Sequence, residues 1–144
     1  MDTIANETYS IGEVAAMFNL SVPTLRYYDH EGLILNLRKN AAGVRQFTEQ
    51  NINAINIIEC LKRAGMSIKN IKQFMKWCDQ GDATLDLRLA MFQELKTQVQ
   101  HQMDELQATM DTIDYKCHYY QQAVADGTEK YVAQSHHHLD TDNL

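Results

Sequence analysis

A helical alternation of apolar and polar residues begins near the N-terminus of the chain. Ser10, followed three residues later by Glu13, has the spacing of a capping box, in which the serine hydroxyl and the glutamate carboxylate bind free backbone N–H groups at a helix start. The pattern predicts a short helix over 11–18. The apolar residues on its inner side would be Ile11, Val14, Ala15 and Phe18.

A tight turn and a second short helix follow. Asn19 tolerates a left-handed backbone, Ser21 can cap the next helix, and Pro23 fits a first turn, where no N–H donor is needed. This helix is expected to end near Gly32. Two short helices joined by about three residues are typical of a helix-turn-helix.

The helical period disappears over 33–47, which predicts a small hairpin with a basic tip. Capping residues and the glycines that follow then predict a third helix over 48–64 and a fourth over 67–80. We therefore expect a mainly α-helical winged helix-turn-helix module, with a small β-hairpin wing, over 9–81.

A heptad pattern occupies most of the remaining sequence. Over 84–126 apolar residues recur at alternating steps of four and three, with Lys96 as the one polar occupant. They are Leu85, Leu89, Phe92, Val99, Met103, Leu106, Met110, Ile113, Cys117, Tyr120 and Val124. A helix of this length measures on the order of 60 Å and needs a partner along its apolar stripe. The simplest partner is the same helix of a second copy, which gives an antiparallel coiled-coil homodimer. The alternative is a helix folded back on its own domain.

The heptad pattern ends before Gly127. We assign 82–126 to a dimerisation helix and 127–144 to a flexible tail. The tail holds three adjacent histidines, at 136–138, which could bind a transition metal weakly. Adjacent histidines in a polar tail are more often incidental, so we predict no metal site.

Charge is unevenly distributed along the chain, whose net charge is -6. Residues 21–76 carry nine Lys or Arg and four Asp or Glu, whereas acidic residues dominate after residue 80. A local excess of positive charge suits contact with phosphates. No membrane span or signal peptide is indicated, and three scattered cysteines form no disulfide framework. We therefore expect a cytoplasmic protein that does not contact a membrane.

The second predicted helix concentrates hydroxyls, rings and a guanidinium within little more than one turn. These groups belong to Thr24, Arg26, Tyr27 and Tyr28. Arginine can bind guanine or phosphate, and Thr and Tyr hydroxyls donate to phosphate oxygens. The structural alternative is that one tyrosine belongs to the core and Arg26 pairs with Asp29 or His30.

Three stretches, Tyr9–Ala15, Ser21–Ile34 and Gly43–Phe47, closely resemble the N-terminal module of the MerR family of bacterial transcription regulators. The similarity continues through 58–67 into the long helix. In that family the second helix enters the major groove of DNA and the hairpin is a wing that grips flanking backbone. The resemblance implies a homodimer that binds palindromic double-stranded promoter DNA. It also implies that the promoter is distorted so that RNA polymerase, an indirect partner, can use it.

The resemblance assigns DNA contacts by position. The matching residues are Ser21, Thr24, Arg26 and Tyr27 in the recognition helix, Arg38 and Arg45 in the wing, and Lys62 near a phosphate-contacting stretch. The wing departs from the family pattern at two places. Asn36 stands where a proline is common, and Val44 stands where an aromatic residue usually follows the glycine.

Cys60 is the tentative effector-sensing residue. It lies near Lys62 and Arg63, cations that favour a thiolate, and a branch of the family that senses aldehydes and other thiol-reactive stress carries a cysteine at this place. The alternative is an inert, small apolar side chain. A metal-responsive regulator is less favoured, because the start of the long helix, 81–84, lacks a cysteine and Cys117 with His118 cannot close a site alone.

Two classes of function remain open. One is a sequence-specific transcription regulator, and the other is a coiled-coil interaction protein whose basic module binds nucleic acid without selecting a sequence. An enzyme is not expected, because the sequence has no glycine-rich phosphate loop, no paired carboxylates in a plausible pocket and no nucleophile with an orienting base. No cofactor is expected.

Overall fold

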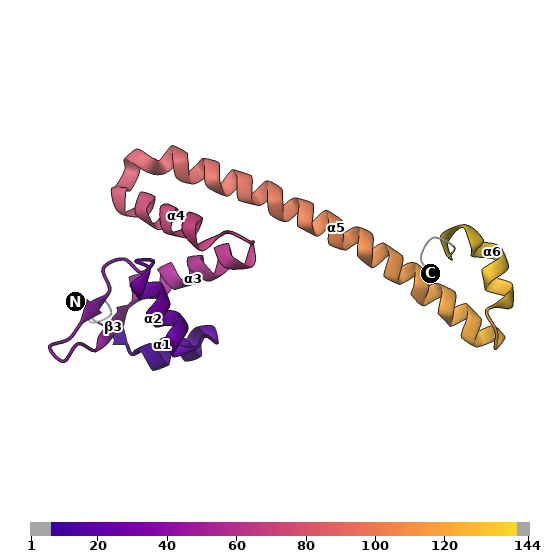
Figure 1. Cartoon of the computed structure of the whole chain (residues 1–144), viewed down its shortest axis with the longest axis horizontal. Coiled ribbons are helices and arrows are strands. Elements are labelled where there is room, and N and C mark those ends of the chain that lie inside the picture. The colour runs from indigo at the N-terminus through magenta and orange to yellow at the C-terminus, as the bar shows by residue number, and fades with distance from the viewer. Residues whose placement is uncertain (1–6, 141–144) are drawn as a thin grey trace. The chain divides into compact units, whose positions relative to one another are not determined.

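The computed structural model describes residues 7–140, with side chains up to residue 135. The chain divides into two compact units on either side of the Thr97–Gln98 peptide bond. The elements in chain order are β1 (Thr8–Tyr9), α1 (Ile11–Phe18), α2 (Val22–His30), β2 (Arg38–Lys39), β3 (Arg45–Thr48), α3 (Glu49–Arg63), α4 (Ile68–Gln80), the 3-10 helix η2 (Gly81–Thr84), α5 (Leu85–Asp126) and α6 (Lys130–Asp140) (Figure 1).

The predicted start of α1 is confirmed in detail. The backbone N–H of Glu13 donates to Oγ of Ser10 at 3.1 Å, and the backbone N–H of Ser10 donates to Oε1 of Glu13 at 2.9 Å. Asn19 ends the helix in the left-handed region, with φ of 53°. Ser21 then caps α2, which ends at His30, two residues before the expected Gly32. The helix-turn-helix is therefore present with the expected caps.

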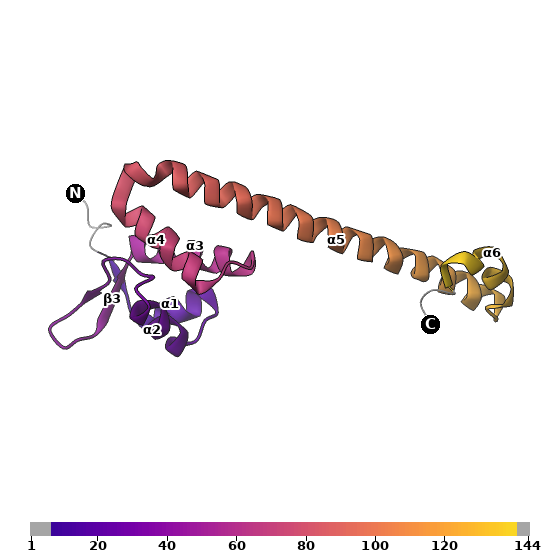
Figure 2. The same cartoon turned by 45° about the horizontal axis from the view of Figure 1, so that its top comes forward.

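The wing is a three-stranded antiparallel sheet in the order β1-β3-β2. In its register Tyr9 lies opposite Phe47, and Lys39 lies opposite Arg45. The hairpin predicted over 33–47 is confirmed for the strands β2 and β3, whereas the residues before β2 form a loop. The strand β1 was not expected, because two residues are too few to give an alternating pattern. In both views the β2–β3 hairpin projects away from the helices (Figures 1 and 2).

The segment between α2 and β2 is an irregular loop that contributes to the core. Leu33 and Ile34 are buried, and the side-chain amide of Asn51 donates to the backbone oxygen of Leu35 at 2.9 Å. Asn36 has φ of 59°. A proline ring holds φ near -65°, so a proline at position 36 could not adopt this conformation. The departure from the family pattern thus has a local conformational consequence.

One apolar core unites the helices and the wing of the first unit. Its largest fully buried side chains are Tyr28, Phe47, Leu25, Leu33, Ile55, Ile58, Leu61, Ile71 and Val14. Asn51 is also buried, and its hydrogen bonds to Thr48 and Leu35 offset the cost of placing an amide there. This core fixes α2 against α3, and therefore fixes which residues of α2 face outward.

The expected long helix is confirmed as α5, which runs unbroken for 42 residues. Most residues of its heptad stripe are exposed in the single chain, from Phe92 at 37% to Val124 at 80%. No described helix holds an apolar run long enough to cross a bilayer.

The expectation of a tail without regular structure over 127–144 is wrong for Lys130–Asp140, which form α6. Val132 of α6 is buried together with Tyr119 and Ala123 of α5. Gly127 makes the turn between the helices with φ of 75°. The heptad pattern gives no sign of α6, because this helix covers a face of α5 outside the 3.5-residue stripe. The side chains of His136–His138 lie outside those that the structure describes.

Candidate nucleic-acid interface

The outer face of α2 carries the residues with base- and phosphate-binding chemistry. Arg26 is exposed, and Tyr27 keeps 45% of its surface exposed. Among the side chains of residues 7–135 no ion pair joins Arg26 to another residue, and Asp29 pairs with wing residues instead. The guanidinium of Arg26 therefore faces solvent. The alternative in which Arg26 pairs with Asp29 or His30 is therefore not seen among the described side chains.

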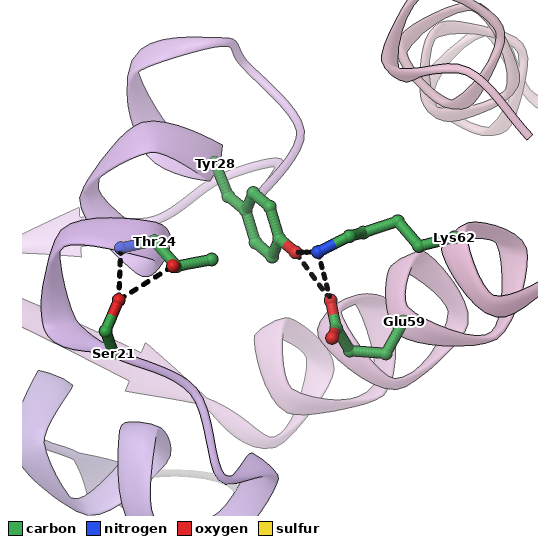
Figure 3. A network of polar contacts seen from close by, with 5 residues as sticks. All are labelled: Ser21, Thr24, Tyr28, Glu59 and Lys62. Atoms are coloured by element: carbon green, nitrogen blue, oxygen red, sulfur yellow. Dashed lines mark hydrogen bonds and ion pairs between the residues drawn. The ribbon is translucent and has the colours of Figure 1, made fainter.

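Ser21 and Thr24 form a pair at the N-terminus of α2 (Figure 3). Their side-chain oxygens lie 2.7 Å apart, and Oγ of Ser21 also accepts from the backbone N–H of Thr24 at 3.2 Å. Ser21 is thus first a helix cap. The N-terminus of a helix favours anions, so the same two hydroxyls lie where a phosphate would be stabilised.

Tyr28 turns the other way and is 1% exposed. Its hydroxyl donates to Oε2 of Glu59 at 2.6 Å, and the ammonium of Lys62 donates to the same hydroxyl (Figure 3). Nζ of Lys62 also lies 3.6 Å from Oε2 of Glu59 and 5.1 Å from the centroid of the Tyr28 ring. Burial, followed by the hydrogen bond to Glu59, raises the pKa of Tyr28 above its ordinary value. This network ties α2 to α3, and it confirms that one tyrosine of the pair is a core residue.

Lys62 is therefore placed by two partners rather than extended freely from α3. Its side chain remains 37% exposed. An ammonium has three N–H donors, so the hydrogen bond to Tyr28 leaves two of them, one beside Glu59, for an external acceptor. Tyr28 and Glu59 thus hold the ammonium of Lys62 in one position, from which it could donate to a phosphate.

The wing carries three basic residues, which differ in how closely they contact the rest of the protein. Arg38 of β2 is exposed, whereas Arg45 of β3 is half-buried and donates from Nε to Oδ2 of Asp29 at 2.8 Å. Lys39 approaches the same carboxylate oxygen at 3.8 Å. The tip beyond them is closed by Asn40, whose Oδ1 accepts from the backbone N–H of Val44 at 3.0 Å. Arg45 thus lies where the wing meets α2.

Cys60 is exposed on α3. Its neighbour Glu59 accepts a hydrogen bond from Tyr28, and Lys62 donates a hydrogen bond to the same tyrosine. Cys117 is also exposed, and Nδ1 of His118 is 2.8 Å from the backbone oxygen of Asp114. Within the described residues no three His, Cys, Asp or Glu side chains converge on a metal position.

Two long-range contacts of this region were not predicted. Glu59 and Asp29 connect α2 to α3 and to the wing, respectively. The pairings span 31 and 16 residues. Periodicity reveals which side chains share one helix face but not which distant element lies opposite, so no local signal identified these partners.

A helix-turn-helix with an antiparallel wing defines a class of DNA-binding module that places its second helix in the major groove. Comparison with known proteins narrows this class. Residues 9–77 match the family described as MerR HTH family regulatory protein, and residues 52–115 match that described as MerR, DNA binding. The chain is also 38% identical over 125 residues, 87% of its length and 93% of the relative, to an uncharacterized HTH-type transcriptional regulator of Haemophilus influenzae. It belongs to the MerR family of DNA-binding transcription regulators.

Solved structures agree with this placement. HiNmlR, described as a MerR family regulator lacking the sensor domain and bound to promoter DNA, is 37% identical with a TM-score of 0.77 over 85% of this chain and 98% of that one. A MerR family regulator from Bacillus thuringiensis is 35% identical with a TM-score of 0.70 over 76% of this chain and 96% of that one. A further relative, AdhR of Bacillus subtilis, is 35% identical over 79 residues, which cover 55% of this chain and 56% of AdhR.

Proposed function

We propose that the chain acts as a homodimer that binds a palindromic promoter sequence and distorts the DNA to control transcription. The observation that carries this proposal is the outward face of α2, where Arg26 and Tyr27 are exposed beside a wing whose Arg45 is held by Asp29. Residues 9–81 would bind DNA, and 82–126 would dimerise. Promoter DNA bound to HiNmlR supports the same partner here.

The roles divide between α2 and the wing. Arg26, Thr24 and Tyr27 would approach the major groove, where an arginine can donate two hydrogen bonds to guanine. Ser21 at the helix cap, Arg38, Arg45 and Lys62 would bind phosphates, which position the protein without reading sequence. We expect α2 to supply sequence selection and the wing to supply affinity.

The stripe on α5 supports dimerisation. Leu106 is 69% exposed and Met103 58% exposed, which is unfavourable for a single chain in water. Tyr119 and Ala123 are covered by α6, whereas Tyr120 and Val124 on the heptad face remain at least half exposed. The stripe is therefore available to the same stripe of a second copy, in an antiparallel arrangement with twofold symmetry.

A twofold dimer suits a palindromic site, because each copy presents the same face of α2 to one half-site. Distorting the DNA costs several kcal/mol on elastic estimates, so a modest change in dimer geometry would shift the balance between distorted and relaxed promoter. RNA polymerase would respond to the promoter shape rather than to a direct contact.

Selection of DNA from a genomic pool by the full-length protein tests this function. We expect the recovered fragments to share an inverted repeat. Recovery of fragments without a common sequence would contradict the proposal and favour the second class, a coiled-coil protein that binds nucleic acid non-specifically.

We further propose that thiol-reactive carbonyl compounds are the signal and that Cys60 is the sensor. Its exposed place on α3, next to Glu59 of the network that holds α2, supports this role. An adduct at this position would alter the surface of α3 close to the recognition helix. The resemblance to the aldehyde-responsive branch of the family points in the same direction.

Replacement of each cysteine tests the sensor separately from DNA binding. Cys60→Ser is expected to bind the selected promoter like the wild type but to lose induction by a carbonyl electrophile such as formaldehyde. Cys78→Ser is the control, since Cys78 is a half-buried cysteine of α4 that lies outside the proposed dimer stripe, and it is expected to keep induction. Full induction of Cys60→Ser would show that Cys60 is not the sensor. It would not contradict the proposed DNA-binding function.

A further inference from the structure

The joint between the DNA-binding helices and the long helix is a short and specific piece of structure. α4 ends at Gln80, and α5 begins at Leu85 after the four residues of η2. Gly81 opens the joint with φ of 83° and ψ of -155°, a conformation that other residues rarely adopt. The direction of α5 relative to α4 is decided within these residues.

Two side chains, Thr84 of η2 and Arg88 of α5, bind backbone oxygens of α4 and η2. The hydroxyl of Thr84 lies 2.6 Å from the backbone oxygen of Trp77 and 2.8 Å from that of Gly81. Arg88 donates from Nη2 to the oxygen of Gly81 at 2.9 Å and from Nε to Oγ1 of Thr84 at 3.0 Å. Thr84 is 5% exposed although it is polar. Carbonyl groups at the end of a helix lack partners within the helix, and here Thr84 and Arg88 supply them.

We propose that Thr84 and Arg88 form a latch that sets the angle between α4 and α5 and so controls how the dimer distorts DNA. The inference rests on the proposed dimer. If the two DNA-binding modules are joined through their α5 helices, the angle at each joint determines the separation and direction of the two recognition helices. Arg88 and Thr84 are then positioning residues for promoter distortion, although neither touches DNA.

A separate contact keeps α4 and α5 together without the latch. The rings of Phe74 in α4 and Phe92 in α5 meet edge to face, with centroids 5.2 Å apart. Apolar packing of this kind is less directional than hydrogen bonds from a guanidinium. Loss of the latch should therefore make the angle between α4 and α5 more variable, while the two helices stay packed through Phe74 and Phe92.

The test compares DNA affinity with DNA distortion. Thr84→Val removes the hydroxyl at similar size, Arg88→Met removes the guanidinium, and Thr84→Ser restores a hydroxyl. Thr97→Val is the matched control, because the hydroxyl of Thr97 bonds only within α5, to the backbone oxygen of Gln93 at 3.2 Å. The DNA is the duplex recovered by genomic selection, labelled at both ends for energy transfer, together with a version in which one half-site is scrambled.

We expect Thr84→Val and Arg88→Met to bind the single half-site within about threefold of the wild type and to change transcript output from the full promoter by about tenfold. In both variants the energy transfer between the duplex ends should change in parallel with the transcript output. Thr84→Ser and Thr97→Val should match the wild type. The half-exposed Arg88 can be replaced without leaving a buried cavity, so Arg88→Met decides the question if Thr84→Val does not fold.

Two results would overturn the latch. One is a parallel loss of half-site affinity and distortion, which a general loss of folded structure would produce. The other is wild-type distortion in both variants. The proposed function fails separately, if the wild-type chain is monomeric or leaves the selected duplex undistorted.

Discussion

Nε of Arg45 donates to Oδ2 of Asp29 at 2.8 Å, which joins the wing to the recognition helix α2. Lys39, on the adjacent strand, lies 3.8 Å from the same oxygen. A bond from Nε leaves the two Nη groups of Arg45 for a phosphate. Asp29 therefore fixes the wing relative to α2 and orients the guanidinium of Arg45, which we propose binds a phosphate.

Arg45→Ala should weaken binding to all DNA sequences alike. Removing one phosphate contact lowers the magnitude of the slope of log K against log salt by about 0.9. The slope is measured by titrating the selected duplex and a scrambled duplex at several salt concentrations. An unchanged slope would show that Arg45 does not contact a phosphate.

Asp29→Asn is the matched comparison for Arg45→Ala. The amide oxygen can still accept from Arg45, but the negative charge is lost. The salt slope should stay at or above the wild-type value, because no cation has been removed. A slope lowered as far as that of Arg45→Ala would mean that the carboxylate, rather than Arg45, sets the number of phosphate contacts.

Tyr28→Phe should lower the free energy of unfolding by about 1 kcal/mol, because the variant loses the hydroxyl that bridges Glu59 and Lys62. Tyr27→Phe is the control, since Tyr27 is 45% exposed, and should change stability by less than about 0.5 kcal/mol. Urea unfolding measures both. Equal stability of Tyr28→Phe and the wild type would mean that the network contributes nothing to holding α2.

The same tyrosine gives a dependence of stability on pH. Its pKa is raised in the folded chain, so the unfolded chain loses the phenolic proton first, near its ordinary pKa of about 10. The stabilisation is present below pH 10 and declines as pH rises above it, by at most about 1.4 kcal/mol per pH unit. Unfolding between pH 8 and about 11 should show a steeper decline for the wild type than for Tyr28→Phe. Identical slopes would contradict the raised pKa.

Leu106→Asp should convert the dimer to a monomer. Leu106 lies on the heptad stripe of α5 and is 69% exposed in the single chain, so a carboxylate there harms the proposed coiled coil rather than the fold. Ala108→Asp adds the same charge away from the stripe and should remain dimeric. Sedimentation measures the mass of each. Dimeric Leu106→Asp at micromolar concentration would place the dimer contact elsewhere.

Local chemistry made much of the fold predictable. The capping box at Ser10 and Glu13, the left-handed Asn19 and the cap at Ser21 each act over three residues or fewer, and the structure contains all of them. The stripe on α5 was equally visible, since one period holds for 42 residues. These features depend only on neighbours along the chain.

Long-range contacts explain what the sequence did not reveal. Tyr28 meets Glu59 across 31 residues, and β1 consists of Thr8 and Tyr9 paired with β3. α6 was missed because it packs through Val132 on a face of α5 that the heptad does not use. The resemblance assigned Arg45 to the predicted DNA contacts, but its partner Asp29 became evident only in the packed structure.

The most direct measurement of the central claim is a hydroxyl-radical footprint of the full-length protein on a fragment recovered from genomic DNA. The account predicts two protected half-sites related by an inverted repeat and separated by about one helical turn or a multiple of it. Protection should be lost together from both half-sites in Leu106→Asp. Weak protection spread evenly along the fragment would contradict sequence-specific binding by a dimer.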